Sequence, residues 1–149
     1  MLYISIRDIK NEKYNMELDM KTICKRLTCN SELRKEIFAL AKDNEVLAGV
    51  ILSSVGSLKR VKIRLANGQD IMEICEPLEI ISLNGTVSKE RIHLHISCSK
   101  TNGEVVGGHL LDGVVNTTCE LVVGLIDGFI FEQEFDRKTG YNEILIKNK

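Results

Sequence analysis

All three histidines of this 149-residue chain, His93, His95 and His109, lie within one segment, RIHLHISCSKTNGEVVGGHL. Residues two apart on a β-strand point to the same face, with Cα atoms about 6.6 Å apart, so His93 and His95 can share one metal ion. Neutral imidazole is a ligand of zinc and of other divalent transition metals. Three protein ligands leave one position for water or a small-molecule ligand, as in catalytic zinc sites. The alternative, which composition alone favours, is three unrelated half-exposed side chains.

The third histidine reaches the other two only in one strand register. A two-residue loop at Asn102-Gly103 would turn His109 to the wrong face of the sheet. A three-residue loop at 101–103 pairs His109 with His95 instead. A bulge at Gly107-Gly108 is a second way to correct the facing, because glycine is the residue that bulges favour. The spacing predicts a metal site under either of these two arrangements.

Two further kinds of ligand are candidates near the histidines. Glu120 is the carboxylate that we expect to bind the metal, to act as a base or to orient a ligand; the alternative is a surface glutamate on a strand. Cys98 and Cys119 are weaker candidate ligands. The five cysteines form no CxxC pair, which predicts reduced thiols in a cytoplasmic protein.

One helix is predicted in the segment CNSELRKEIFALAKDNEV. Asn30 or Ser31 is placed to cap its first turn, and Asp43-Asn44 to end it. The apolar residues at helical spacing on one face are Leu33, Ile37, Leu40 and Ala41. This pattern predicts a helix that packs one face on a core.

The chain after residue 45 is predicted to be mainly strand. VLAGVILSSV is typical of a central strand buried on both faces, and LKRVKIRLANGQDIMEI predicts a hairpin around Asn67-Gly68. The expected fold class is α+β, with one principal helix packed on a large, mainly antiparallel, partly closed β-sheet in a single domain, 1–149.

Charge and hydropathy exclude some classes of function. Residues 1–60 carry 11 Lys and Arg against 8 Asp and Glu, and the whole chain carries a net charge of −1. Binding to nucleic acid depends on clustered positive charge, so a dedicated DNA-binding surface is not expected. The chain contains no stretch apolar enough to span a membrane, and its N-terminal MLYISIRDIKNEK lacks the features of a signal peptide.

Five segments resemble, in order, the plants-and-prokaryotes-conserved (PPC) domain family. They are AGVILSSVGSL, EPLEIISLNGTV, HLHIS, GEVVGGHL and TTCELVV. The resemblance implies an α+β domain that assembles as a homotrimer and groups His93, His95 and His109 at a metal site. It also places the family's late-strand glutamate at Glu120.

The same resemblance bears on partners. In plant members the segment that corresponds to Glu79, Ile80 and Ile81 is linked to partner contacts, and we expect it at the oligomer interface. Plant members join the domain to AT-hooks, whereas free-standing prokaryotic members are described as DNA-binding proteins without a secure activity. This chain has Asn84 where a serine is common, and it contains no Arg-Gly-Arg-Pro motif, so direct contact with DNA is doubtful.

Two functions follow from these patterns. The first is a homotrimeric binding or regulatory module with a three-histidine metal site and a DNA or protein partner. The second is a small metal-dependent enzyme that acts on a small molecule at the same site. A pocket beside the histidines distinguishes the two, because an enzyme needs one and a module does not.

Overall fold

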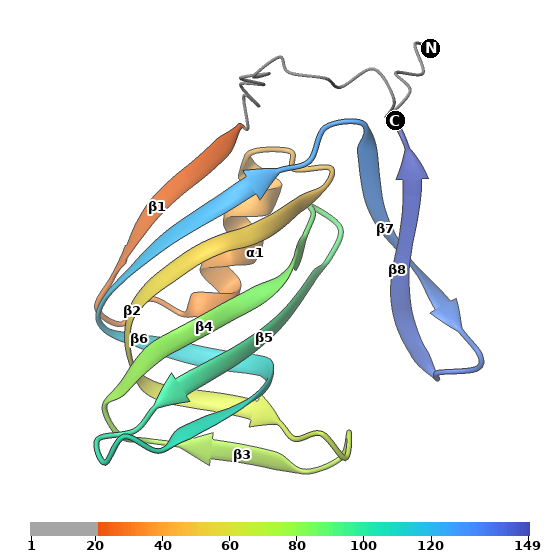
Figure 1. The fold of residues 1–149 in the computed structure, drawn as a ribbon. Helices are drawn as coiled ribbons and strands as arrows, with labels where there is room; N and C mark the ends of the chain where they lie inside the picture. The colour runs from red at the N-terminus through yellow and green to blue at the C-terminus, as the bar shows by residue number, and fades with distance from the viewer. Residues whose placement is uncertain (1–20) are drawn as a thin grey trace, which may run out of the picture.

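The computed structural model describes residues 21–149 and shows a large antiparallel sheet with one helix (Figure 1). The elements, in chain order, are β1 Thr22–Thr28, α1 Leu33–Asp43, β2 Gly49–Arg64, β3 Ile71–Ile74, β4 Leu78–Val87, β5 Ile92–Ser99, β6 Val105–Leu125, β7 Phe129–Asp136 and β8 Tyr141–Asn148. The predicted fold class is confirmed. Residues 1–20 lie outside the described residues; they are part of the predicted single domain 1–149 and contain the N-terminal segment MLYISIRDIKNEK.

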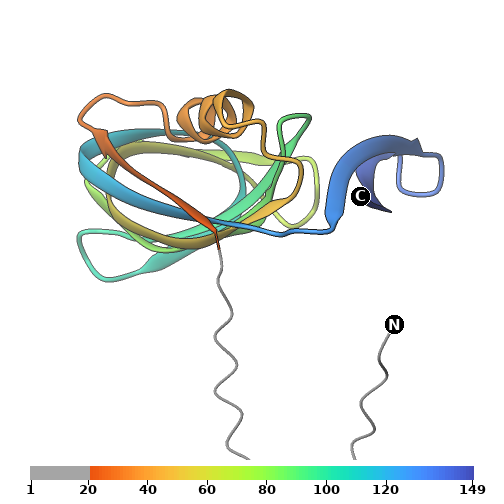
Figure 2. The same cartoon turned by 90° about the horizontal axis from the view of Figure 1, so that it is seen from above.

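Four strands close into a ring. The sheet order is β1-β6-β5-β4-β2-β3, and β6 also pairs with β2, so β2, β4, β5 and β6 form a circuit without a free edge. Strands β1 and β3 extend it at the sides of β6 and β2. Figure 2 shows this ring end-on, with α1 along one side and the β7–β8 hairpin standing beside it. The predicted partial closure is therefore correct, and closure removes most of the unpaired strand edge.

The two longest strands make closure possible because they bend. The β2–β6 ladder contains register shifts, the last of them between Lys62 and Ile63, and bulges of this kind increase the local bend and twist of a strand. At Gly56 the strands approach so closely that a Cβ would lie 2.1 Å from the carbonyl oxygen of Thr118. Only glycine fits there, so this part of the bend depends on a single residue type.

The helix packs its predicted face on the core. Its buried residues are Leu33, Ile37, Leu40 and Ala41, all predicted from spacing. It ends at Asp43, as expected, and the side-chain amide of Asn44 donates to the carbonyl of Leu40 over 2.8 Å.

The predicted N-cap was wrong. The N-cap residue is Glu32, and no side chain caps the first turn. Asn30 and Ser31 are held by β6 instead: the Asn30 amide donates to Val115 O, and the Val115 amide donates to Ser31 O, both over 3.0 Å. Glu32 forms an isolated bridge to Val114. Pairing with a strand therefore outweighed local capping at this position.

The expectation for residues 46–55 was half right. The start of β2 pairs with both β4 and β6, so it is central. It is not buried on both faces, because Leu52 and Val55 are 47% and 59% exposed. The inner face packs on the core, and the outer face leaves apolar side chains uncovered in the single chain.

The predicted hairpin around Asn67-Gly68 forms, and a second hairpin forms from β7 and β8. Residues 61–64 of β2 pair with 71–74 of β3, and the Leu65 amide donates to Asp70 O across a four-residue loop that contains Asn67 and Gly68.

Near the C-terminus, β7 and β8 form a separate two-stranded sheet rather than part of the main one. Phe131 of β7 is 7% exposed, and its amide donates to Leu47 O over 2.9 Å. The hairpin is therefore tied to the body at its base.

Candidate metal site and adjoining pocket

The three histidines lie on one face of two neighbouring strands. On β5, His93 and His95 flank Leu94, which is buried in the core, so both imidazoles point away from the core. On β6, His109 is the direct cross-strand partner of His95. Directly opposed residues share a face, so the topology brings all three side chains together within one chain.

The loop between these strands settles the question of register. The Lys100 amide donates to Glu104 O over 2.8 Å, and the Gly103 amide donates to Lys100 O over 2.9 Å, leaving the three residues 101–103 in the turn. The β5–β6 register runs without a shift from His95 to Ser99. The three-residue loop is therefore the arrangement that the chain adopts, and no bulge on this ladder is needed.

The double glycine before His109 has a different role from the expected one. A Cβ at Gly107 would lie 2.7 Å from the carbonyl oxygen of Ile96, and one at Gly108 would lie 2.6 Å from that of Arg64. Both distances are below normal van der Waals contact. The two glycines thus let β6 lie tightly between β5 and β2, immediately before the residue that completes the cluster.

The donor atoms of the cluster are close enough for one ion. One ring nitrogen from each of His93, His95 and His109 lies within 4.8 Å of the other two. The Nε2 atoms of His93 and His95 are 3.3 Å apart. Two nitrogens at zinc–nitrogen bond length in a tetrahedral site are about 3.3 Å apart, so this pair already has the required spacing. The ring centroids are separated by 5.0 to 5.6 Å, which leaves a small adjustment for His109.

A second observation bears on the fit of a metal. The Nδ1 atom of His109 is buried and has no hydrogen-bond partner among the described residues. Leaving a polar atom buried and unpaired is unfavourable by about 1 to 3 kcal/mol, and a bound ion at this nitrogen would satisfy it. The donor set, three imidazoles, suits a divalent transition metal. The residues present therefore fit such an ion.

Burial keeps two of the imidazoles uncharged. Partial burial, followed by the positive charge of Arg64, lowers the pKa of His109 to about 4. Burial, and then the neighbouring His95, lowers the pKa of His93 as well. Metal ligands must be deprotonated, and the lowered pKa values keep both of these side chains neutral at neutral pH. The cluster is thus ready to bind a cation at neutral pH.

Other candidate ligands are not brought to this cluster. Glu120 is exposed and pairs with Arg26 of β1 and Val55 of β2, eleven residues along β6 from His109. Cys98 and Cys119 are buried in the core, and burial raises the pKa of the Cys98 thiol to about 11. A protonated core thiol is a poor metal ligand. Within the described part of the chain, the converging group is the three histidines.

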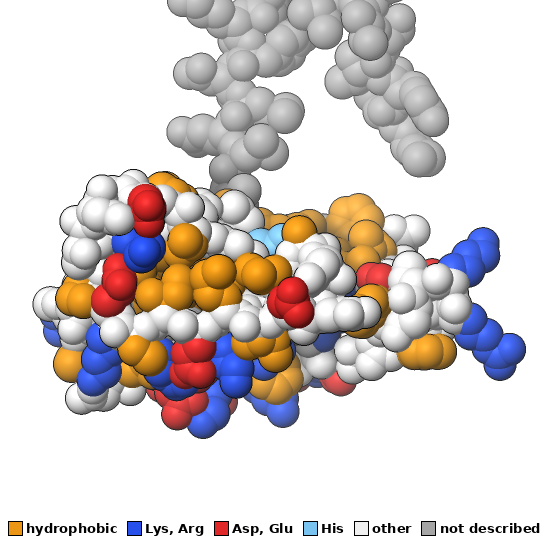
Figure 3. All heavy atoms as spheres, turned by 90° about the horizontal axis from the view of Figure 1, so that it is seen from below, with side chains coloured by type: hydrophobic (Ala, Val, Ile, Leu, Met, Phe, Trp, Pro, Cys, Tyr) orange, Lys and Arg blue, Asp and Glu red, His pale blue; other side chains and the backbone are white. Residues whose placement is uncertain are grey.

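The residues expected at an oligomer interface split between the two faces of β4. Ile80 is 7% exposed and belongs to the core, whereas Ile81 is 58% exposed, and Glu79 is exposed as well. Ile81 joins Leu52, Val55 and Val105 among the exposed large apolar residues. Figure 3 shows apolar side chains gathered in a band across one face of the molecule.

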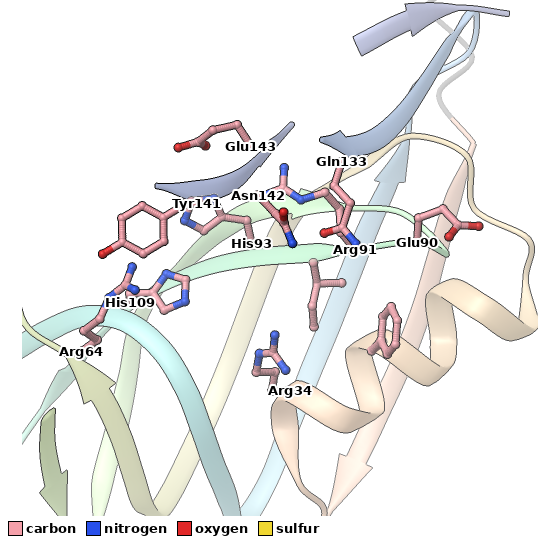
Figure 4. A pocket seen from close by; sticks show the side chains of 12 residues that line it. Arg34, Arg64, Glu90, Arg91, His93, His109, Gln133, Tyr141, Asn142 and Glu143 are labelled. Carbon is pink, nitrogen blue, oxygen red and sulfur yellow. The ribbon is translucent and has the colours of Figure 1, made fainter. Parts of the chain in front are cut away.

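A pocket that sequence patterns did not indicate borders the cluster. Its volume is about 380 Å³, within the usual range for small-molecule sites. Figure 4 shows its lining, which includes His93 and His109. The other labelled lining residues are Arg34, Arg64, Glu90, Arg91, Gln133, Tyr141, Asn142 and Glu143. They come from α1, β2, the turn before β5 and the β7–β8 hairpin, so no local motif could have grouped them.

Comparison with known proteins supplies a family. The model of the Plants and Prokaryotes Conserved (PCC) domain matches residues 14–127. A curated relative, the bifunctional protein GlmU of a Synechococcus strain, is 35% identical over 123 residues, which are 82% of this chain and 20% of that protein. The chain thus spans about a fifth of the length of this relative.

Two solved structures share the fold over most of both chains. A hypothetical protein from Salmonella cholerae-suis is 30% identical with a TM-score of 0.83, covering 87% of this chain and 95% of its own. A metal-containing protein from Archaeoglobus fulgidus is 32% identical with a TM-score of 0.72, covering 84% of this chain and 93% of its own.

Proposed function

The chain belongs to the Plants and Prokaryotes Conserved (PCC) domain family, and we propose that it is a homotrimeric metal-binding protein. In this proposal each subunit holds one divalent transition metal ion, zinc first, between His93, His95 and His109. The observation that carries the proposal is the convergence of three ring nitrogens within 4.8 Å on the outer face of the sheet. The similarity to a metal-containing archaeal protein, 32% identical, supports it.

The metal would have an open position toward solvent and the pocket. His95 is exposed, while His93 and His109 are half-buried and line the pocket. A three-ligand metal of this kind supplies Lewis-acid chemistry and can lower the pKa of bound water. The protein's own part is to hold three neutral imidazoles in place and to shape the space beside them.

A second candidate function, a small metal-dependent enzyme, is favoured by one observation. The pocket of about 380 Å³ lies directly against two of the three histidines, which a purely structural module does not need. Zinc-loaded protein and the His95→Ala variant would be incubated in parallel with a mixture of small metabolites and followed by NMR. Consumption of a compound by the zinc-loaded protein alone would support the enzyme, and no consumption by either would favour the binding module.

The remaining elements of the proposal concern assembly and surroundings. We infer a trimer from the family and from the uncovered apolar side chains, with Glu79 and Ile81 at the interface.

Partners beyond copies of the chain are a small molecule at the metal and a regulatory protein, rather than DNA bound directly. We place the protein in the cytoplasm because its cysteines are all free. No helix within residues 21–149 is long and apolar enough to cross a membrane.

Metal analysis tests directly whether the chain binds a metal ion. Protein purified without added metal and without chelators would be assayed for metal content, then reconstituted with zinc and assayed again. We expect one ion per chain after reconstitution and far less in a triple His93→Ala, His95→Ala, His109→Ala variant. Equal content in both proteins would refute the metal site.

A further inference from the structure

Three arginines reach into the pocket from three different elements. Arg34 comes from the first turn of α1, Arg64 from the end of β2 and Arg91 from the turn before β5 (Figure 4). All three are half-buried. The charges are close enough to affect the histidines, because Arg64 and Arg34 both contribute to the lowered pKa of His109. The pocket beside the metal site is therefore positively charged on several sides.

Among residues 21–149 these three arginines differ from Arg60 in having no counterion. Arg60, which is also half-buried, pairs with Glu73 at 2.9 Å and with Asp112 at 2.5 Å. Among residues 21–149, no carboxylate lies within 4.0 Å of the guanidinium groups of Arg34, Arg64 or Arg91. Holding a charged group partly out of water without a partner is unfavourable. A bound anion would remove that penalty.

Local contacts hold two of the three arginines in place. The Arg64 guanidinium stacks 5.2 Å from the ring centre of Tyr141 on the hairpin. The Arg91 backbone is clamped by Ser88, whose amide donates to Arg91 O over 2.8 Å and whose hydroxyl accepts from the Arg91 amide over 3.2 Å. Arg34 lies in the first turn of a helix, where a positive charge opposes the helix dipole. Its position therefore does not serve helix stability.

The pocket also contains negative charges, which reduce its net positive charge. Glu90 and Glu143 line it and lie at opposite edges in Figure 4. Three arginines against two glutamates leave one net positive charge before any metal binds. A divalent ion on the histidines would raise this to three. The arginines repel that ion, so an anion between them and the metal would relieve both the repulsion and the missing counterions.

On this basis we propose that the pocket binds the oxyanion group of a small organic acid, held by Arg34, Arg64 and Arg91 beside the metal. Guanidinium groups bind carboxylate and phosphate oxygens with two parallel hydrogen bonds, which suits both chemistries. The placement of the anion beside a metal rests on the proposed metal site, whereas the anion site itself does not, since the arginines act on the anion directly. The volume of about 380 Å³ restricts the ligand to a small molecule.

The far wall of the pocket belongs to the β7–β8 hairpin, which contributes Gln133, Tyr141, Asn142 and Glu143. The family match ends at residue 127, so this wall lies beyond the matched domain. The amide groups of Gln133 and Asn142 and the ring of Tyr141 would contact the part of the ligand that the arginines do not bind. The hairpin is thus the element that selects among small acids.

The test uses malonate, inorganic phosphate and the neutral analogue malonamide as probes of the zinc-loaded full chain, with binding measured by calorimetry. We expect malonate or phosphate to bind and malonamide to bind at least about tenfold more weakly, since hydrogen bonds between ionised partners are roughly twice as strong as neutral ones. Which anion binds more tightly identifies the ligand as a carboxylate or a phosphate. Equal binding of all three probes, or of none, would overturn the proposal.

Two variants assign the binding to the arginines. Arg34→Gln should weaken binding of the preferred anion about tenfold or more, while the matched Arg137→Gln variant, in the exposed turn of the hairpin, should bind like the parent. The same loss in both variants would contradict the proposal. The titration is repeated on metal-free protein, where weaker but Arg34-dependent binding is expected. If zinc fails to bind the histidines, the titration of metal-free protein still shows whether the anion site exists.

Discussion

His95 and His109 face each other across the β5–β6 ladder, and this pairing decides whether the chain has a metal site at all. The pairing depends on the three residues 101–103 in the loop. One residue more or fewer would turn His109 to the opposite face, because side chains alternate along a strand. The chemistry of the site therefore depends on the length of a loop that contains none of the ligands.

The tight packing beside this pair predicts the effect of adding one methyl group. Gly108→Ala would place a Cβ 2.6 Å from Arg64 O, and forcing the strands apart should reduce the free energy of unfolding by about 1 to 3 kcal/mol. It should also weaken zinc binding, because His109 follows directly. Gly113→Ala is the matched control, since its nearest contact is a side-chain carbon at 3.4 Å. Equal losses of stability in both variants, measured by urea denaturation, would count against this explanation.

A second prediction concerns the protonation of His109 in the metal-free protein. Its Hε1 resonance should titrate with a midpoint at about 4, whereas an exposed histidine titrates near 6.5. The unfolded chain takes up this proton near pH 6.5 and the folded chain only near 4, so protonation favours unfolding. The free energy of unfolding should fall as the pH drops from about 6.5 to about 4. A midpoint near 6.5 in the NMR titration would show that burial does not hold this imidazole neutral.

The pH dependence of zinc binding follows from the same lowered pKa values. From the sequence alone, protons are expected to compete with zinc for the histidine nitrogens near pH 6.5. Burial lowers the pKa values of His93 and His109, so protons compete with zinc at these two residues only at lower pH.

Assembly yields a third prediction from two isoleucines of nearly equal exposure. Ile81 on β4 is 58% exposed and Ile146 on β8 is 57% exposed. If Ile81 meets a neighbouring subunit, Ile81→Glu buries a charge and should convert the trimer to monomer, whereas Ile146→Glu should leave it intact. Sedimentation equilibrium at micromolar concentration measures both. A parent protein that is already monomeric, or a trimer that survives Ile81→Glu, would contradict this interface.

A fourth prediction concerns DNA. With a net charge of −1, the chain should bind duplex DNA weakly, and the slope of log affinity against log salt should be shallower than about −3, as for few phosphate contacts. Fluorescence anisotropy with random and AT-rich duplexes at two salt concentrations measures this. Tight, sequence-selective binding at physiological salt would restore a direct role on DNA.

Local patterns predicted the elements better than they predicted how the elements meet. The apolar face from Leu33 to Ala41 and the hairpin at Asn67-Gly68 depend on neighbours in the chain, and both formed where expected. The three-histidine cluster was also within reach, because Leu94 separates His93 from His95 and strand alternation fixes their facing. Sequence alone could not choose between a three-residue loop and a bulge, since both give the same facing.

What failed depended on long-range pairing. The N-cap was misplaced because β6, more than eighty residues later, holds Asn30 and Ser31. The sequence did not predict the anion pocket, because Arg34, Arg64 and Arg91 belong to three parts of the chain that meet only when the sheet closes. Glu120 remains a prediction as a partner of the metal: within one subunit its strand neighbours are Arg26 and Val55.

The central claim, one metal ion held by three histidines, is tested most directly by competitive zinc titration of the purified chain against a chromophoric chelator. The parent should bind one zinc per chain, and His95→Ala should lose this binding while keeping its circular dichroism and its urea midpoint, because His95 is exposed and outside the core. Asn84→Ala is the matched control, since Asn84 is exposed and is the cross-strand partner of His95 on β4. Stoichiometric zinc binding that survives His95→Ala unchanged would contradict the account.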